Sequence, residues 1–352
     1  MTPARLRVGV VGLGGNTRQR HVPGLLACPE VEIAAVCNRR PESTAAAAQE
    51  FGIPKTFAQW QQLVADPEID AIVIGTWPYL HAPITLAALE HGKHVLCEAR
   101  MAMNAAEARE MLGASERHPD RVCQIVPSPH GLGLDSTVRQ LLADGYLGQL
   151  REVVAIGATD ALADPATPLA WRQVRELSGL NMLTLGILHE TLMRWIDEPV
   201  RVMAQVQAFT PERLDPATGV RRRVGTPDSV HVLAAFADGS QGVYHVSSAI
   251  HHGPGHQIHL YGSEGTLKLE LAPQERIWGA RRGEPGLKEL PITKQPADGW
   301  CVEADFVASI REGRPVTRTD FASGVRYMEF TEAVARSAVS GAAVALPLEA
   351  EE

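Results

Sequence analysis

The chain has 352 residues and a formal net charge of −8 at neutral pH. This length exceeds what one hydrophobic core usually holds, which predicts two domains. The acidic balance disfavours a nucleic-acid-binding protein, which carries a basic face, and the sequence has no apolar run near the roughly 20 residues that span a bilayer. Five scattered cysteines without a Cys-x-x-Cys pair predict free thiols in a reducing cytoplasm.

The first 124 residues alternate apolar strands with helices. Strands are expected at 6–14, 31–38, 71–77, 94–98 and 122–127. Helices are expected between them, at 18–29, 41–52, 81–92 and 104–117. Continuous apolar strands separated by helices of about ten residues are typical of βαβ units, whose parallel sheet is buried on both faces. We therefore predict a doubly wound parallel sheet of the Rossmann type over residues 1–124.

The pattern changes after residue 124. Strand-like alternation is expected at 150–161, 200–210, 229–250 and 256–271, and helices at 134–148, 179–199, 301–313 and 321–341. Ala-Asp-Gly-Ser at 237–240 and Gly-Ser-Glu-Gly at 262–265 are hairpin signals between strand-like runs. Residues 125–352 are therefore expected to form an α/β domain with a largely antiparallel open sheet, one face of which is covered by helices.

Glycines stand where the first strand meets the first helix. Gly12 would make the tight turn, and Gly14 would let the backbone approach a pyrophosphate at the helix N-terminus. Gly-x-Gly-x-x is weak evidence alone, but here it ends a strand and opens a βαβ unit, which is the confirming context. Thr17 occupies the third small position, where its β-branched side chain is bulkier than usual. The alternative is a glycine turn that binds no ligand.

The end of the second strand predicts which dinucleotide binds. NAD enzymes usually carry a carboxylate here for the ribose hydroxyls. This chain instead has Asn38, followed by Arg39 and Arg40. Arginine donates charge-assisted hydrogen bonds to a 2′-phosphate, and asparagine does not repel one. NADP is therefore slightly favoured over NAD, and the alternative is that the two arginines only line a solvated loop.

Four segments spread along the chain carry a resemblance to a known family. They are residues 75–102, 169–181, 259–270 and 306–347. Together they resemble the glucose–fructose oxidoreductase / inositol dehydrogenase / MocA (Gfo/Idh/MocA) family over nearly the full length. The resemblance implies a Rossmann domain and a C-terminal α/β domain whose open sheet often serves oligomerisation, here as a dimer or tetramer. It also implies NAD(P)-dependent oxidation or reduction of a sugar, inositol or related polyol.

The chain departs from this family where chemistry is expected. The family's Cys-Glu-Lys-Pro motif reads Cys-Glu-Ala-Arg at 97–100, so Glu98 is kept and the catalytic lysine is replaced by Ala99. On the central helix, the positions of the family's Asp, His and Asp are also replaced, and they hold Thr184, Leu188 and Thr191. These losses occur together, which indicates a divergent subgroup that lacks the usual lysine.

Two histidines are candidates for a relocated acid–base group. His189 follows the lost family histidine, and histidine is the side chain best suited to proton transfer near neutral pH. One residue turns a side chain by about 100° around a helix, so the alternative for His189 is a packing role. His81 lies where the family's loop approaches the nicotinamide, and its alternative is capping or packing. Arg100 stays protonated and is a candidate for binding phosphates or an anionic substrate.

The pattern and the resemblance together predict a cofactor-binding set. Its members are Gly12, Leu13, Gly14, Gly15, Asn16, Thr17, Asn38, Arg39, Arg40, Thr76, Trp77, His81, Glu98, Arg100 and Arg172. No metal site is expected, because the histidines between 251 and 259 lack a Cys or carboxylate at a recognised spacing.

We therefore expect a cytoplasmic, homo-oligomeric, NAD(P)-dependent oxidoreductase that acts on a sugar-like substrate through an atypical active site. We expect it to bind neither nucleic acid nor membrane. Two alternatives remain open. One is a non-catalytic dinucleotide-binding sensor or partner protein, and the other is an enzyme that uses transient oxidation for lyase, epimerase or glycosidase chemistry.

Overall fold

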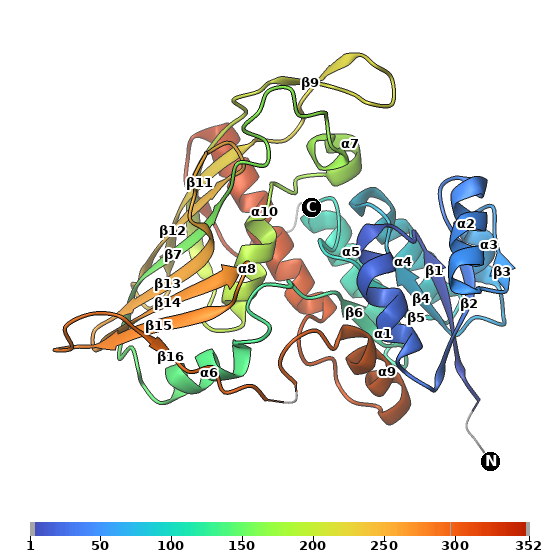
Figure 1. Cartoon of the computed structure of the whole chain (residues 1–352), viewed down its shortest axis with the longest axis horizontal. Helices are drawn as coiled ribbons and strands as arrows, with labels where there is room; N and C mark the ends of the chain where they lie inside the picture. The colour runs from blue at the N-terminus through green and yellow to red at the C-terminus, as the bar shows by residue number, and fades with distance from the viewer. Residues whose placement is uncertain (1–3, 296, 350–352) are drawn as a thin grey trace. The chain divides into compact units, whose positions relative to one another are not determined.

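The chain divides into two compact units in the computed structural model, which describes residues 4–295 and 297–349 (Figure 1). The first unit comprises Met1–Pro127 and Cys301–Val325, and the second comprises Ser128–Trp300 and Arg326–Glu352. The expected domains, 1–124 and 125–352, differ from these units chiefly in one segment, 301–325, which belongs to the first unit. Its backbone pairs there, because Ile125 N–H donates to Thr319 O at 2.9 Å. The sequence shows where apolar residues recur along the chain, but it does not show which distant segments pair with one another.

The first unit contains a six-stranded parallel sheet in the order β3-β2-β1-β4-β5-β6. Its strands are β1 (Leu6–Val11), β2 (Val31–Cys37), β3 (Lys55–Thr56), β4 (Ala71–Ile74), β5 (His94–Cys97) and β6 (Cys123–Ile125). Its helices are η1 (Thr17–His21, a π-helical turn), α1 (Val22–Leu26), α2 (Pro41–Phe51), α3 (Trp60–Ala65), η2 (Pro78–Leu80), α4 (His81–Glu90), α5 (Ala105–Arg117) and α9 (Val302–Glu312). The predicted Rossmann arrangement is confirmed, because helices alternate with strands that are buried on both faces.

The second unit contains a nine-stranded sheet in the order β16-β15-β14-β13-β7-β12-β11-β8-β17. Its strands are β7 (Leu150–Ala158), β8 (Pro199–Gln207), β11 (Ser229–Phe236), β12 (Gln241–Ser247), β13 (Gly255–Gly262), β14 (Gly265–Ala272), β15 (Arg276–Arg281), β16 (Lys288–Leu290) and β17 (Val344–Ala345), beside a separate pair, β9 (Glu212–Leu214) and β10 (Arg221–Arg223). Its helices are α6 (Asp135–Ala143), η3 (Trp171–Gln173), α7 (Arg175–Ser178), α8 (Leu185–Met193) and most of α10 (Phe321–Ser340), within which the division of units falls.

This second sheet is largely antiparallel, as predicted, with one parallel pair between β7 and β12. Both expected hairpins are present, joining β11 to β12 and β13 to β14. Along β11, buried and exposed residues alternate, so one face of the sheet is covered and the other is open; on the covered face, α8 packs against β7 (Figure 1).

The helix expected over 179–199 is shorter than predicted. Only Leu185–Met193 forms α8. Gly179 has a φ of +66° and Leu183 a φ of +47°, so the backbone before α8 cannot be helical. Apolar residues recur along this whole stretch because the turns before α8 are buried as well as α8 itself.

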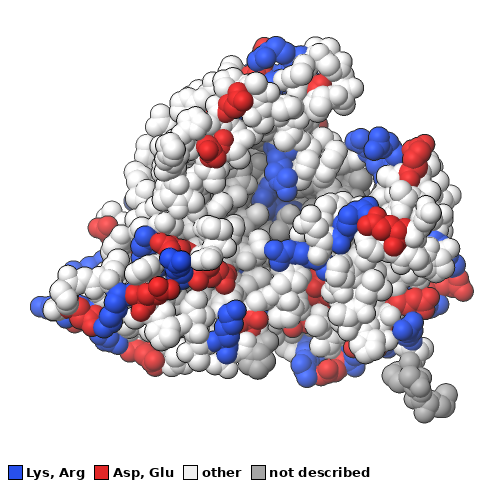
Figure 2. All heavy atoms as spheres, in the orientation of Figure 1, with Lys and Arg blue, Asp and Glu red and all other residues white. Residues whose placement is uncertain are grey.

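Acidic and basic side chains are interspersed over the face of the molecule that Figure 2 shows. Within the described ranges, the structure has no helix with the length and apolar character needed to cross a membrane.

Candidate functional site

The glycine-rich turn after β1 forms an open cradle. Gly12 has a φ of +86°, and a Cβ there would lie 2.7 Å from Thr76 N, so only glycine fits this turn. A Cβ on Gly14 would meet nothing nearer than Gly75 O at 3.8 Å, and one on Gly15 would meet no atom within 4 Å. The chain becomes helical from residue 15. The geometry therefore fits a pyrophosphate, because exposed backbone with small residues stands at the start of a helix.

The bulk of Thr17 is accommodated by a glycine on the neighbouring strand. Thr17 is buried, and its hydroxyl donates to Gly12 O at 3.2 Å. A Cβ on Gly75, just after β4, would overlap this hydroxyl. The close helix–strand contact that a third glycine usually allows is thus retained, with the glycine moved to position 75.

The cradle opens into a cavity of about 680 Å³ at the carboxyl ends of the strands. Its lining includes Gly12, Leu13, Gly14, Asn38, Arg39, Arg40, Thr76 and Trp77. These residues come from the ends of β1, β2 and β4, where ligands bind in open parallel sheets. The structure thus brings together much of the predicted cofactor-binding set around one cavity.

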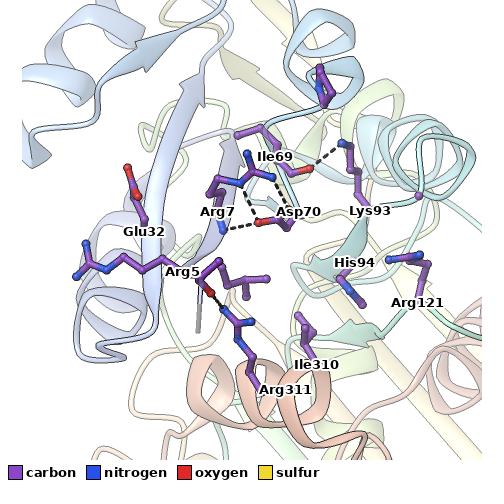
Figure 3. Close-up of a pocket in the computed structure, with 14 residues that line it drawn as sticks. Arg5, Arg7, Glu32, Ile69, Asp70, Lys93, His94, Arg121, Ile310 and Arg311 are labelled. Atoms are coloured by element: carbon purple, nitrogen blue, oxygen red, sulfur yellow. Dashed lines mark hydrogen bonds and ion pairs between the residues drawn. The ribbon is translucent and has the colours of Figure 1, made fainter. Parts of the chain in front are cut away.

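A second cavity, of about 690 Å³, lies at the amino ends of the same strands (Figure 3). Figure 3 shows Arg7 facing Asp70, with a guanidinium–carboxylate distance of 2.9 Å, and Lys93 donating to Ile69 O. Because it opens at the opposite edge of the sheet from the glycine turn, this cavity is separate from the one at the cradle.

Asn38 supports the glycine turn from inside. Its Oδ1 accepts a hydrogen bond from Leu13 N–H at 2.6 Å, and its Nδ2 donates to Ser43 O at 3.0 Å. Arg39 lies over the ring of Trp77, with its Cζ 5.3 Å from the ring centroid. The guanidinium and the indole thus lie together in the lining of the cavity, between the segments that follow β2 and β4.

Glu98 follows β5 and belongs to a cluster that the sequence did not reveal. Its Oε1 lies 2.9 Å from His21 Nε2 and also accepts from Asn16 Nδ2. Burial opposes ionisation of Glu98, but its hydrogen bonds with His21 and Asn16 outweigh this and lower its pKa. His21 Nδ1 lies 2.5 Å from Glu303 Oε1. Asn16 and Glu98 were predicted as site residues, whereas His21 and Glu303 carry no local sequence signal.

His81 begins α4 and is fully buried. Its Nδ1 lies 2.9 Å from Arg100 O and its Nε2 3.0 Å from Thr76 O, so it links the segments that follow β5 and β4. A neutral ring can donate to only one of these carbonyls at a time. Burial lowers the pKa of His81.

The peptide bond between Ala99 and Arg100 is cis, and the Arg100 side chain is buried. Roles for His81 and Arg100 toward a cofactor stay predictions.

His189 lies in the core of the second unit. Its ring stacks on Phe330 with a centroid distance of 3.6 Å, and its Nδ1 lies 2.9 Å from the Tyr244 hydroxyl. Among the described residues, Nε2 has no hydrogen-bond partner. Burial, with the charge of Arg326 second, lowers the pKa of His189 to about 3. These surroundings agree with the alternative in which His189 packs in the core. Its catalytic assignment stays a prediction.

At the three positions in and just before α8 where the family carries Asp, His and Asp, this chain has buried or half-buried residues. Leu188 and Thr191 are fully buried, and the Thr191 hydroxyl donates to Ser128 Oγ at 2.9 Å. Thr184 is half-buried, close to Gly157 of β7. Arg172 is exposed, with its guanidinium over the Trp171 ring, and its predicted cofactor contact stays a prediction.

Known proteins resemble the chain over nearly its full length. A family described as "Oxidoreductase family, NAD-binding Rossmann fold" matches residues 6–125, and "GFO/IDH/MocA C-terminal domain" matches 136–268. The dTDP-3,4-didehydro-2,6-dideoxy-alpha-D-glucose 3-reductase of Streptomyces antibioticus is 29% identical over 95% of this chain and 97% of its own. Levoglucosan dehydrogenase of Pseudarthrobacter phenanthrenivorans is 24% identical over 97% of this chain and 98% of its own length. A solved structure of levoglucosan dehydrogenase in complex with NADH and levoglucosan shares the fold, with a TM-score of 0.86 and 23% identity over 98% of this chain and 100% of that one.

Proposed function

The chain belongs to the Gfo/Idh/MocA family of oxidoreductases with an NAD-binding Rossmann fold, and on that premise we propose that it oxidises or reduces a sugar, inositol or related polyol. The observation that carries the proposal is the open cradle at Gly14 and Gly15, which leaves room for a pyrophosphate beside exposed backbone. Relatives that act on sugar-like compounds support the substrate class. A bound nicotinamide would supply the hydride chemistry, while the chain's residues bind, orient and move protons.

The test is an assay of nicotinamide absorbance with a panel of sugars and polyols, in both directions. We expect turnover with at least one of them. The alternative is a non-catalytic dinucleotide-binding protein, which the apolar residues at positions 99 and 188 favour. Tight dinucleotide binding without turnover of any panel member would support that alternative.

We propose that the adenine end of the cavity prefers NADP over NAD. Arg39 and Arg40 line it, and the strand end carries Asn38 instead of a carboxylate. Arg39→Ala is expected to weaken NADPH binding about 10-fold and to leave NADH binding nearly unchanged, because a phosphate contact through arginine is charge-assisted. Calorimetric titration with both dinucleotides measures this. Arg117→Ala, which removes an exposed arginine at the end of α5, is the matched control. Equal losses for both dinucleotides would contradict the preference.

We propose that the open face of the second sheet joins copies of this chain as a dimer or tetramer. Met203, Leu233 and Val243 are aligned across β8, β11 and β12, and their side chains are 48%, 60% and 43% exposed. An apolar row in the middle of an open sheet is stabilised by a partner that removes it from water.

Leu233→Glu is therefore expected to convert the oligomer to monomers at micromolar concentration, as measured by sedimentation velocity. Val339→Glu is the control, because Val339 is 91% exposed but lies on α10 instead of the sheet. An unchanged sedimentation coefficient for Leu233→Glu would place the interface elsewhere.

We also propose a cytoplasmic location. Its support is chemical, since all five cysteines are free and a reducing compartment keeps thiols in that state.

A further inference from the structure

A buried histidine between two carboxylates stands behind the glycine turn. His21, in η1, has no exposed surface. Its Nδ1 lies 2.5 Å from Glu303 Oε1 of α9, and its Nε2 lies 2.9 Å from Glu98 Oε1, which follows β5. Three segments far apart in the sequence are thus connected through one imidazole ring, all within the first unit.

The two carboxylates have different surroundings. Glu303 is 2% exposed, so its interaction with Nδ1–H fixes the orientation and tautomer of the ring. Nε2, which lies 2.9 Å from Glu98 Oε1, is then the ring nitrogen whose protonation can change. A buried carboxylate that orients the far nitrogen of a catalytic histidine is a recurring arrangement in enzymes.

Of the two carboxylates, Glu98 is the one that has an exposed edge. Its side chain is 14% exposed, and its Oε2 is bonded to Ala99 N–H at 3.2 Å. Glu98 follows β5, whereas Asn38 and Arg39 follow β2 on the opposite side of the glycine turn. A dinucleotide whose adenine lies near Arg39 therefore directs its nicotinamide toward β4 and β5. Glu98 follows β5, so it lies on the nicotinamide side in this arrangement, next to Ala99, where the family carries its lysine.

We propose that Glu98 carries a proton between the substrate hydroxyl and His21, so that this pair replaces the lysine absent at position 99. The proposal rests on the proposed oxidoreductase function. Glu98 is the catalytic residue, while Glu303 is a positioning residue that acts through His21.

In the direction of oxidation, the C–H bond of the alcohol carbon would break, and its hydrogen would pass with both electrons to the oxidised dinucleotide. The O–H bond breaks, its electron pair completes the carbonyl double bond, and its proton goes to Glu98 Oε2. Glu98, now a neutral carboxylic acid, passes this same proton to neutral His21 Nε2, which leaves Glu98 as a carboxylate and His21 as an imidazolium. Reduction of the carbonyl runs the same transfers in reverse.

The pH profile follows from the protonation state that each direction requires. Glu98 and Glu303 face His21 with their carboxylates, and the neutral amide of Asn16 lies 3.5 Å from Nε2. Burial lowers the pKa of His21, but the hydrogen bonds with Glu303 and Glu98 outweigh it and raise the pKa to about 9. Oxidation needs neutral His21, so kcat/KM should rise with pH and level off above about 9. For reduction, kcat/KM should fall over the same interval.

The test compares pH profiles of the full-length chain with its dinucleotide and a sugar from the panel. His21→Gln should lower kcat/KM for oxidation about 10²- to 10⁴-fold at the plateau pH and remove the inflection. Glu303→Gln should move the inflection to lower pH by about one unit or more, because a carboxylate that raises the pKa of His21 is lost. Glu98→Gln, which keeps the size of the side chain, should match the loss in His21→Gln and provides an independent measurement if that variant does not fold.

Glu312→Gln is the matched control, since it makes the same change at an exposed position of α9. It should leave the profile unchanged. NMR titration of the His21 ring in wild type and Glu303→Gln reports the same shift without turnover. A purely structural role would lower the melting temperature of the variants and leave the inflection where it is, which would overturn the relay while sparing the proposed function. A wild type that turns over no sugar would overturn both.

Discussion

Replacing Gly14 by valine is expected to abolish dinucleotide binding while the first unit stays folded. A Cβ at this position meets nothing nearer than 3.8 Å within the chain, so the side chain adds little strain to the protein itself. It projects into the space where a pyrophosphate would approach the backbone. Calorimetric titration should show affinity for NADH and NADPH falling at least about 100-fold, or roughly 2.7 kcal/mol. Circular dichroism and thermal unfolding should remain close to wild type.

Two other glycines serve as controls for this substitution. Gly286→Val places the same side chain where a Cβ has no neighbour within 4 Å, in the second unit, and should leave affinity unchanged. Gly12→Ala should destabilise the fold, since its φ is +86° and its Cβ would lie 2.7 Å from Thr76 N. Unchanged dinucleotide affinity in Gly14→Val would overturn the assignment of this cradle.

Replacing His189 by alanine is expected to lower the free energy of unfolding by about 2–4 kcal/mol. The change removes a ring that stacks on Phe330 and leaves the buried Tyr244 hydroxyl without its contact to Nδ1. Chemical denaturation measures this loss. Tyr244→Phe removes only the hydroxyl and should cost less, about 1 kcal/mol.

The same residue is expected to make the fold sensitive to acid. The pKa of His189 is about 3 in the folded chain and 6.5 in its ordinary state, so the unfolded chain binds the proton first. Stability from His189 is therefore complete above about pH 6.5 and is lost progressively as the pH falls toward 3. His189→Phe should weaken this part of the pH dependence.

Turnover of the His189 variants distinguishes packing from catalysis. If His189 were the relocated acid–base group, His189→Ala would lower the rate about 10²- to 10⁴-fold even under conditions where the variant is folded. Near-normal turnover of the folded variant, together with a large loss in His21→Gln, would assign the proton transfer to the cluster at Glu98.

Local patterns in the sequence predicted the elements around the glycine cradle. The strand ending in Gly12 and Gly14, the helix after it and the polar end of β2 are each encoded within a few residues, because hydrophobic period and glycine conformation are local properties. The hairpins at Asp238–Gly239 and Ser263–Glu264 were predictable for the same reason. Five of the six parallel strands and a mostly antiparallel second sheet follow from these patterns, whereas the two-residue strand β3 was not predicted.

The surroundings of each titratable group were decided only by the tertiary structure. His21 is 77 residues from Glu98 and 282 from Glu303, and nothing in the intervening sequence indicates that they meet. The segment 301–325 returns to the first unit through pairing with residues near 125, a long-range contact without a local signal. His189 follows the family's histidine by one position, and a turn of about 100° on a helix leads to a different neighbourhood. Burial and partners determine whether a histidine is charged, and both depend on packing between segments that are distant in sequence.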